Sequence, residues 1–191
     1  MGPQDCRADD ADFVELHFNQ FSKATQQKAK KFWPTLMTGS GKTTYNFHSH
    51  EWSKHGTCWQ PRLATASKVA PNVRGINQAA VGDLNNGNNV KFQEDYFKVS
   101  LGLNDLLNQK LAPALVALEA GDDGLVDRDD LLAALTRPLG ITKIKGFCKK
   151  NGDGESALTE LYISLDLSYN PINSPKPGLN GCARRVKVAI A

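Results

Sequence analysis

Residues 50–58 of the chain read His-Glu-Trp-Ser-Lys-His-Gly-Thr-Cys. On a helix, where each residue advances by roughly 100°, four polar side chains fall within an arc of about 140°: His50, Lys54, Glu51 and His55. Trp52 falls on the opposite side, where it can anchor the helix in a core. Two imidazoles, an acid and an ammonium group are the groups needed to move protons around a phosphate. We therefore predict an active-site face on a helix.

The same stretch has three other interpretations. A zinc-protease motif needs His-Glu-x-x-His, and here the second histidine comes one residue late. A structural zinc site has suitable residue types but lacks the paired-cysteine spacing of zinc modules; its ligands would be His48, His50, His55 and Cys58. Mixed charges can also form an ordinary solvated helix face. We predict no metal site.

The same nine residues resemble the second conserved active-site segment of the ribonuclease T2 family, His-Glu-x-x-Lys-His-Gly-Thr-Cys. Other segments support this resemblance. Phe32-Trp33-Pro34 is similar to the aromatic-Trp-Pro step that precedes the segment in the family. Gln93-Glu94-Asp95-Tyr96-Phe97 resembles the helix that follows it, and residues 158–167 with Cys182 resemble the C-terminal hairpin.

The resemblance implies an α+β fold in which an antiparallel-rich sheet packs against helices. Helices and strands without regular alternation also favour α+β. A chain of 191 residues with 40% hydrophobic residues is expected to form a single domain over residues 1–191. Relative to the family, residues 59–92 look like an inserted loop, because they are rich in Pro, Asn and Gly and lack periodicity.

One family segment has no counterpart. The family carries an upstream segment, Phe-Thr-x-His-Gly-Leu-Trp-Pro, that supplies another catalytic histidine from a central strand, and nothing in residues 1–31 matches it. His17 lacks the Gly and Trp-Pro context, and we predict that it lies on a helix. We therefore expect an N-terminally truncated chain that lacks the family's N-terminal strands.

The resemblance also implies roles for individual residues. His55 is the base that takes the proton of the RNA 2′-OH, Glu51 and Lys54 stabilise the pentavalent phosphate, and His50 binds phosphate. The upstream histidine would protonate the leaving oxygen. The expected protein is an endoribonuclease that cleaves single-stranded RNA through a 2′,3′-cyclic phosphate, without a metal or other cofactor. The alternative is an impaired or inactive relative that binds RNA or protein, because the upstream histidine is absent.

Two further residues are candidate substrate-binding residues, His48 and Trp52. The family usually has Trp at the position of His48. Two interpretations of His48 stay open: it contacts a base or a phosphate, or it fills a packing position.

Four cysteines without a Cys-x-x-Cys pair are typical of two disulfides in an oxidising compartment, with buried free thiols as the alternative. The sequence allows three pairings. The resemblance implies Cys6–Cys58 and Cys148–Cys182, in a secreted, vacuolar or lysosomal protein. No apolar signal core follows Met1.

The net charge of +3 favours a polyanionic partner only weakly. No apolar run approaches the length of a membrane span. We expect a monomer whose partner is single-stranded RNA and which has no membrane partner.

Periodicity predicts the helices. A helix is expected over residues 12–33, with an apolar stripe of Phe13, Leu16, Phe21 and Ala24. Residues 92–118 are expected to form one or two helices with a break before Pro113, and residues 127–136 a short helix with an acidic first turn.

A strand over residues 158–167 and a second over residues 185–190 are expected to form a hairpin flanked by Cys148 and Cys182. The first strand would place one set of side chains on a common face: Leu161, Ile163, Leu165 and Leu167.

Three stretches resemble phosphate- or calcium-binding loops but lack the pattern that such loops need. Residues 39–44, Gly-Ser-Gly-Lys-Thr-Thr, end like a phosphate-binding loop, but the first glycine of that loop is replaced by Leu36 and residues 45–47 look extended. The Asp/Gly clusters at 122–130 and 151–155 lack the ligand pattern of a calcium loop, and we predict turns.

Overall fold

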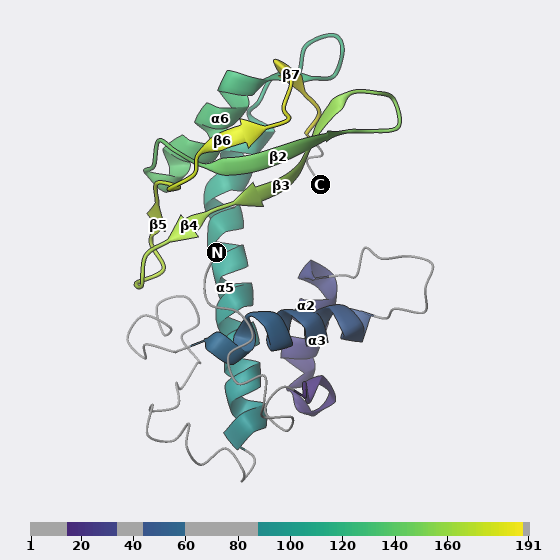
Figure 1. Ribbon diagram of the computed structural model, residues 1–191, viewed down its shortest axis with the longest axis vertical. Helices are drawn as coiled ribbons and strands as arrows, with labels where there is room; N and C mark the ends of the chain where they lie inside the picture. The colour runs from purple at the N-terminus through teal and green to yellow at the C-terminus, as the bar shows by residue number, and fades with distance from the viewer. Residues whose placement is uncertain (1–14, 34–43, 60–87, 189–191) are drawn as a thin grey trace. The chain divides into compact units, whose positions relative to one another are not determined.

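The chain divides into two compact units, an N-terminal unit of residues 1–104 and a C-terminal unit of residues 105–191. The computed structural model describes residues 15–33, 44–59 and 88–188 (Figure 1). Its elements, in chain order, are η1 (Phe18–Gln20), α2 (Lys23–Phe32), α3 (Thr44–Lys54), η2 (Gly56–Cys58), α5 (Asn88–Val116), β1 (Val126–Asp127), α6 (Arg128–Thr136), η4 (Arg137–Leu139), β2 (Lys145–Lys150), β3 (Ser156–Tyr162), β4 (Ser164–Leu165), β5 (Pro171–Ile172), β6 (Gly178–Asn180) and β7 (Arg185–Val186).

The first long helix begins later than the sequence predicts. Ser22 is the N-cap of α2, and its side chain accepts a hydrogen bond from the Thr25 amide at 3.4 Å. Serine at this position satisfies an amide that has no partner within the helix, and its extended backbone ends the preceding segment. The predicted helix over residues 12–33 is therefore wrong for residues 15–22.

The residues of the apolar stripe expected on that helix do not all lie on one helix. Leu16 and Phe21 are buried, but they belong to the segment before α2, whereas Ala24 is exposed. Phe13 lies outside the described residues. His17 precedes the η1 turn and accepts a hydrogen bond from the Gln20 amide through its carbonyl, so the prediction that it lies on a helix is also wrong.

The long helix α5 begins at Asn88 and continues through Pro113 to Val116. It starts four residues before the predicted Phe92, inside the range expected to be an inserted loop; residues 60–87 of that range lie outside the described residues. The expected break before Pro113 is absent. Proline removes one helical hydrogen bond, but here only the last turn follows it. Leu111 is buried and Leu115 packs in the same core, which holds that turn in place.

The core of the N-terminal unit is aromatic. Apolar side chains from the segment before α2, from α2, α3 and α5 form one buried cluster, whose members are Leu16, Phe18, Phe21, Ala29, Trp52, Phe92, Phe97 and Leu101. Five of these carry aromatic rings, which contact one another edge to face or at a tilt, the arrangement that aromatic quadrupoles favour. Phe18 and Phe97, for example, have ring centroids 5.8 Å apart.

Two polar residues of α5 hold the segment before α2. Gln93 is fully buried, donates from Nε2 to the Glu15 carbonyl at 2.7 Å and accepts from the His17 amide at 2.9 Å. Glu94 Oε1 accepts from the Ser22 hydroxyl at 2.6 Å and from the Thr25 hydroxyl at 2.7 Å. These bonds satisfy backbone and capping groups that would otherwise lose their water on folding.

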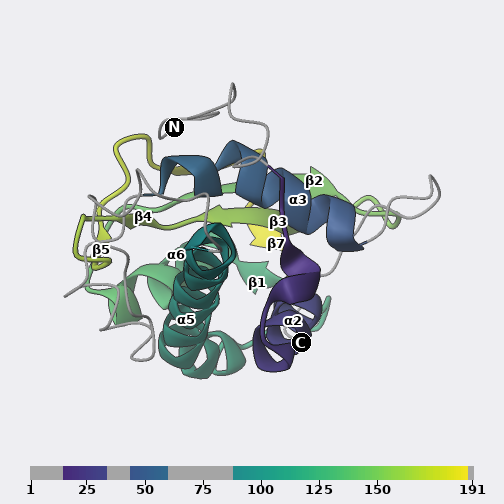
Figure 2. The ribbon, with the colours of Figure 1, turned by 90° about the horizontal axis from the view of Figure 1, so that it is seen from below.

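The sheet of the C-terminal unit is built on β2, in the order β3-β2-β6. β2 pairs with β3 in antiparallel fashion and with β6 in parallel fashion. Two short antiparallel ladders accompany it, β1 with β7 and β4 with β5. Figure 2 shows α6 on one side of the sheet, where Leu131, Leu135 and Cys148 belong to one buried cluster. The α+β fold class with an antiparallel-rich sheet is confirmed.

The predicted hairpin between residues 158–167 and 185–190 is wrong. β3 instead pairs with β2, which precedes it, across a turn in which the Asn151 side chain accepts hydrogen bonds from the amides of Asp153 and Glu155. A five-residue turn closes this hairpin at a smaller loop entropy than the long connection to β7 would need. Lys187, which follows β7, forms a parallel bridge with Ala157 of β3.

The first of these strands is also interrupted. β3 ends at Tyr162, and the following β4 turns back through β5. The Asp166 carboxylate accepts from the amides of Ser168 and Asn170, which closes a turn inside the predicted strand. Leu167 is consequently exposed, whereas the sequence placed it on the apolar face.

Three other predictions for this unit are confirmed. Cys148 and Cys182 form a disulfide. α6 begins after Asp127, whose side chain accepts from the Asp129 amide at 2.8 Å, close to the predicted 127–136. The clusters at 122–130 and 151–155 contain turns, with Gly124 and Gly154 at positive φ, which glycine adopts without strain.

No helix among the described residues is both long and apolar enough to cross a bilayer.

The Glu94 carboxylate gives a testable link between pH and stability. Burial would raise its pKa, but the hydrogen bonds from Ser22, Thr25 and Lys98 outweigh that effect and lower it. Because the folded pKa is lower than the unfolded one, the carboxylate stabilises the fold above the unfolded pKa. That contribution is lost as the pH falls through the folded pKa.

We therefore expect Glu94→Gln to lower the free energy of unfolding at pH 7 by roughly 1–2 kcal/mol, the range for hydrogen bonds to a partly exposed charged group. The deficit should shrink as the pH falls below about 4.3, the unfolded pKa of a glutamate, and it should vanish once the native carboxylate takes up its proton at its lower folded pKa. Urea unfolding at several pH values measures this. Glu119→Gln, at an exposed position, is the control. A deficit that does not change with pH would contradict the assignment.

Candidate functional site

The helix α3 carries the greater part of the 50–58 segment. It runs from Thr44 to Lys54, so the expectation that residues 45–47 are extended is wrong. The His55 amide still donates to the Glu51 carbonyl at 3.1 Å, and the chain then enters η2. His55 therefore occupies the last position of the helical hydrogen-bond pattern.

Side-chain hydrogen bonds follow the same turn. The Ser53 hydroxyl donates to the His50 carbonyl at 3.2 Å, and the Thr57 hydroxyl donates to the Ser53 carbonyl at 3.0 Å. The second bond reaches a carbonyl in the last turn of the helix, where carbonyls lack amide partners from a following turn. The two bonds hold the backbone that carries His50 and His55.

The two faces of this helix end differ in how far their side chains are exposed to solvent. His50 and His55 are exposed, Glu51 and Lys54 are half-buried, and Trp52 is fully buried. This arrangement agrees with the predicted polar face opposite an apolar anchor. The catalytic roles of the four polar residues stay predictions.

Trp52 fixes the helix against α5. Its ring contacts Phe92 and Tyr96 with centroids 5.9 and 5.6 Å apart, both edge to face. Trp59, just after η2, contacts the same two rings at 5.3 and 5.9 Å. The two tryptophans thus hold both ends of the segment against one face of α5. Trp52 was also predicted to bind substrate, and its full burial gives that role no support.

Gly56 allows the chain to turn closely over Trp52. A β-carbon at this position would lie 2.7 Å from Cζ3 and 2.9 Å from Cδ2 of the indole, closer than real β-carbons approach other atoms. Only glycine fits between the ring and the following turn. The position of the adjacent His55 therefore depends on this contact.

Tyr96 lies beside Glu51, and sequence reasoning did not identify it as a site residue. Burial raises the pKa of the Tyr96 hydroxyl, and the negative charge of Glu51 raises it further. The hydroxyl is consequently neutral at physiological pH, and its hydrogen bond with the Ser100 side chain partly opposes the shift. The sequence signal was the Gln93–Phe97 segment, but nothing in it indicated which of its residues faces α3.

His48 is a core residue, and its burial gives the predicted substrate-binding role no support. The side chain is fully buried, and Nε2 lies 3.1 Å from the Trp33 carbonyl, to which its N–H can donate. The ring packs on Phe18 at 4.5 Å and on Phe97 at 5.8 Å. The packing interpretation of His48 is therefore confirmed. Its Nδ1 has no hydrogen-bond partner within the described part of the chain.

The zinc alternative finds no support in this geometry, since His48 is enclosed by aromatic rings while His50 and His55 are exposed. Within residues 15–33, 44–59 and 88–188, no three His, Cys, Asp or Glu side chains form a group that could hold a metal ion. Cys6 lies outside the described residues, as does the side chain of Cys58, so the Cys6–Cys58 disulfide stays a prediction.

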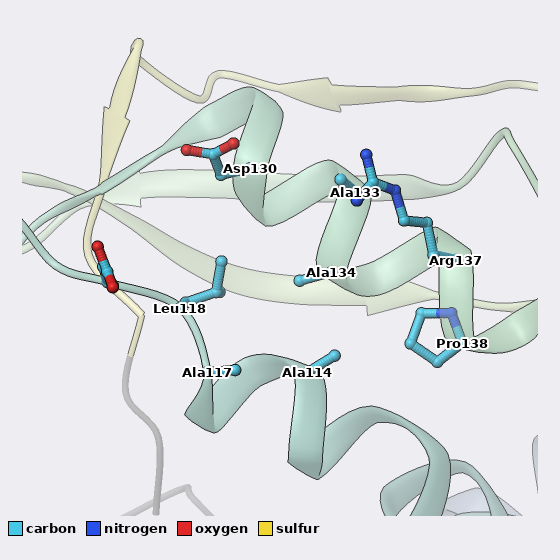
Figure 3. A pocket seen from close by; sticks show the side chains of 9 residues that line it. Ala114, Ala117, Leu118, Asp130, Ala133, Ala134, Arg137 and Pro138 are labelled. Carbon is cyan, nitrogen blue, oxygen red and sulfur yellow. The ribbon is translucent and has the colours of Figure 1, made fainter.

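A groove in the C-terminal unit does not contain the predicted chemistry. It has a volume of about 430 Å³ and lies between the end of α5 and α6 with η4 (Figure 3). Its walls are mainly alanines with Leu118 and Pro138. Its charged lining residues include Asp130 and Arg137, which Figure 3 labels. The candidate catalytic residues all belong to the N-terminal unit.

Comparison with known proteins gives one consistent result. The sequence model of the ribonuclease T2 family matches residues 1–174. Ribonuclease 3 of Arabidopsis thaliana is 26% identical over 187 residues, which are 97% of this chain and 68% of that protein. Ribonuclease 1 of the same organism is 28% identical over 142 residues, which are 73% of this chain and 47% of that protein.

Solved structures with the same fold agree. RNase NT in complex with 5′-AMP superposes with a TM-score of 0.56 at 20% identity, covering 97% of this chain and 74% of that one. Trichomaglin, described as a novel S-like ribonuclease, gives 0.53 at 19% identity over 98% and 73%. An RNase-related protein from Calystegia sepium gives 0.51 at 16% identity over 97% and 73%. At these identities the likeness concerns the fold.

The contact between Gly56 and Trp52 can be tested by adding one methyl group. We expect Gly56→Ala to lower the free energy of unfolding by about 1–3 kcal/mol, because the β-carbon overlaps the indole and either the turn or the ring must shift. Gly152→Ala is the matched control, since nothing lies within 4 Å of a β-carbon there. Chemical denaturation measures both, and equal effects of the two changes would contradict the packing argument.

The buried His48 predicts a loss of stability in acid. Burial lowers its pKa, with the nearby Lys30 adding to the effect, although hydrogen bonds to the backbone of Trp33 and Ala29 oppose it. The unfolded state then takes up the proton first, so stability falls as the pH drops below about 6.5 and stops falling below the lowered pKa. We expect His48→Phe to flatten the profile of melting temperature between pH 7 and pH 5. His55→Ala, at an exposed histidine, is the control, and identical profiles for the wild type and His48→Phe would contradict the assignment.

Proposed function

Because this chain belongs to the ribonuclease T2 family, we propose that it is an endoribonuclease that cleaves single-stranded RNA through a 2′,3′-cyclic phosphate. One observation carries the proposal beyond family membership. The exposed imidazoles of His50 and His55 lie on a helix end whose backbone is fixed by the burial of Trp52. A rigid backbone under accessible acid–base groups is what positioned proton transfer requires.

The reaction follows from the chemistry of RNA. The imidazole of His55 takes the proton from the 2′-OH, and the 2′-oxygen attacks the adjacent phosphorus. A P–O2′ bond forms, the P–O5′ bond breaks, and the 5′-oxygen takes up a proton as it leaves. The products are a 2′,3′-cyclic phosphate end and a 5′-hydroxyl end. The nucleophile is the substrate's own hydroxyl, so we propose that the reaction requires no metal-bound water.

The neighbouring groups complete this assignment. His50 binds the phosphate, and Lys54 with Glu51 stabilises the pentavalent state. Lys54 is half-buried, so its positive charge acts through a medium of lower dielectric constant than water and attracts the phosphate more strongly. Tyr96 stays neutral beside Glu51 and therefore adds no second negative charge there.

The compartment belongs to the same proposal. The Cys148–Cys182 disulfide favours an oxidising environment, and we propose that the protein is secreted or resides in a vacuole or lysosome. We also propose that it acts as a monomer and that residues 1–191 form a single family domain.

A second candidate function is the binding of RNA or of a protein without cleavage of RNA. The observation that favours it is that the 191 residues contain no His-Gly-Leu-Trp-Pro segment, to which the resemblance assigns the acid for the leaving oxygen. His48 does not replace that acid, because it is fully buried.

The two candidates are separated by a cleavage assay on a fluorescent oligoribonucleotide with chromatographic detection of cyclic-phosphate ends. We expect His55→Ala to lower kcat/KM by about 10²–10⁴-fold, the usual contribution of a general base. His17→Ala is the control. Cleavage that a chelator abolishes, or that His55→Ala leaves undiminished, would contradict the mechanism. An intact chain that binds RNA but releases no cyclic-phosphate ends would establish the second candidate.

A further inference from the structure

A basic strand of the C-terminal unit presents an aromatic ring beside its lysines. Residues 143–150 read Lys-Ile-Lys-Gly-Phe-Cys-Lys-Lys, with four lysines and no acid. Side chains alternate along a strand, and Gly146 and Cys148 of β2 are buried. The residues on the opposite face of β2 are Lys145, Phe147 and Lys149.

The neighbouring strand adds a tyrosine to this face. In the β2–β3 register Lys145 pairs with Tyr162, so both side chains lie on the same side of the sheet. The rings of Phe147 and Tyr162 meet edge to face with centroids 5.8 Å apart, and Lys145 Nζ lies 5.0 Å from each centroid. Tyr162 is 49% exposed, so a planar ligand has access to its ring.

One acidic residue lies on this face, and its carboxylate contacts two neighbouring side chains. Glu160 accepts a hydrogen bond from the Tyr162 hydroxyl at 2.7 Å, and its carboxylate lies 3.9 Å from Lys149 Nζ. The bond holds the tyrosine ring in one orientation. Across β2 from Tyr162, the position on β6 that pairs with Lys145 is Gly178, which has no side chain to cover the lysine. Among the described residues, no acidic side chain forms an ion pair with Lys145.

We propose that this face, formed by Lys145, Phe147, Lys149 and Tyr162 and called the β2–β3 face, is a binding site for single-stranded RNA. A base stacks on the exposed ring of Tyr162, while backbone phosphates contact the two lysines. Proteins that bind single strands combine these two elements, a stacking ring and a row of cations. Lys145 and Lys149 are four residues apart on a strand, or about 13 Å, so they contact different phosphates.

The choice of RNA rests on the proposed function, which names RNA as the substrate, but the site is separate from the residues that carry the chemistry. All residues of the β2–β3 face belong to the C-terminal unit, and the candidate catalytic residues belong to the N-terminal unit. The exposed aromatic ring favours RNA over an acidic protein segment, because every base offers a face that stacks on it. Binding here would hold a long RNA chain independently of the bond that is cleaved.

The test uses the full chain and a fluorescent 12-nucleotide 2′-O-methyl RNA, which has no free 2′-OH and cannot be cleaved. We expect Tyr162→Ala to weaken binding about tenfold, the loss of one stacked base. Tyr162→Phe keeps the ring and should keep the affinity within about twofold. Lys145→Ala with Lys149→Ala should reduce the slope of log affinity against log salt by about 1.4, the value for two phosphates on a single strand. Lys110→Ala, at an exposed lysine of α5, is the control and should leave the slope unchanged.

Glu160→Gln separates binding from folding defects. Removing this negative charge should strengthen binding severalfold, a result that loss of structure does not produce. The inference is overturned if the intact chain does not bind the oligonucleotide, if Tyr162→Ala and the double lysine variant bind as the wild type does, or if an acidic peptide of equal charge displaces RNA from the face. Cleavage is measured separately: loss of cleavage with retained, Tyr162-dependent binding would overturn the proposed function and support this site.

Discussion

The burial of Trp52 against α5 is the contact on which the candidate site depends. It occupies the core side of α3, so the side chains on the other side of the helix, including His50 and His55, reach solvent. The close approach of Gly56 to the same ring then determines how the chain leaves the helix. A change in the position of this one indole would therefore move both the helix and the turn that carries His55.

α5 supports this contact with two different kinds of side chain. Its aromatic residues, Phe92 and Tyr96, form the surface on which Trp52 packs. Its polar residues, Gln93 and Glu94, hold the segment before α2 through hydrogen bonds to backbone and capping groups. Alternating roles of this kind are possible because consecutive residues on a helix face different directions. The segment that resembles a family helix thus acts as the organising element of the N-terminal unit.

In both units, the elements with local signals could be predicted from the sequence. The helical spacing of residues 50–58 placed Trp52 opposite the polar groups, and α6 was predicted almost to its ends from an acidic first turn. The errors came where a local signal competed with a tertiary contact. His48 looked like a site residue by composition, but its aromatic neighbours come from the segment before α2 and from α5, far away in sequence. Strand pairing in the C-terminal unit failed for the same reason, since periodicity indicates a strand but does not identify its partner.

The sequence by itself determined the family, the α+β class, the Cys148–Cys182 pairing by resemblance, and the residue types available for catalysis. These follow from motif, spacing and composition, which are properties of the chain alone. The tertiary structure decided which of those residues are accessible: His50 and His55 reach solvent, whereas His48 and Trp52 are enclosed. It also decided that β2 pairs with β3 and brings Tyr162 beside Lys145. Burial and strand partners depend on contacts between segments distant in sequence, and a local pattern carries no information on how those segments meet.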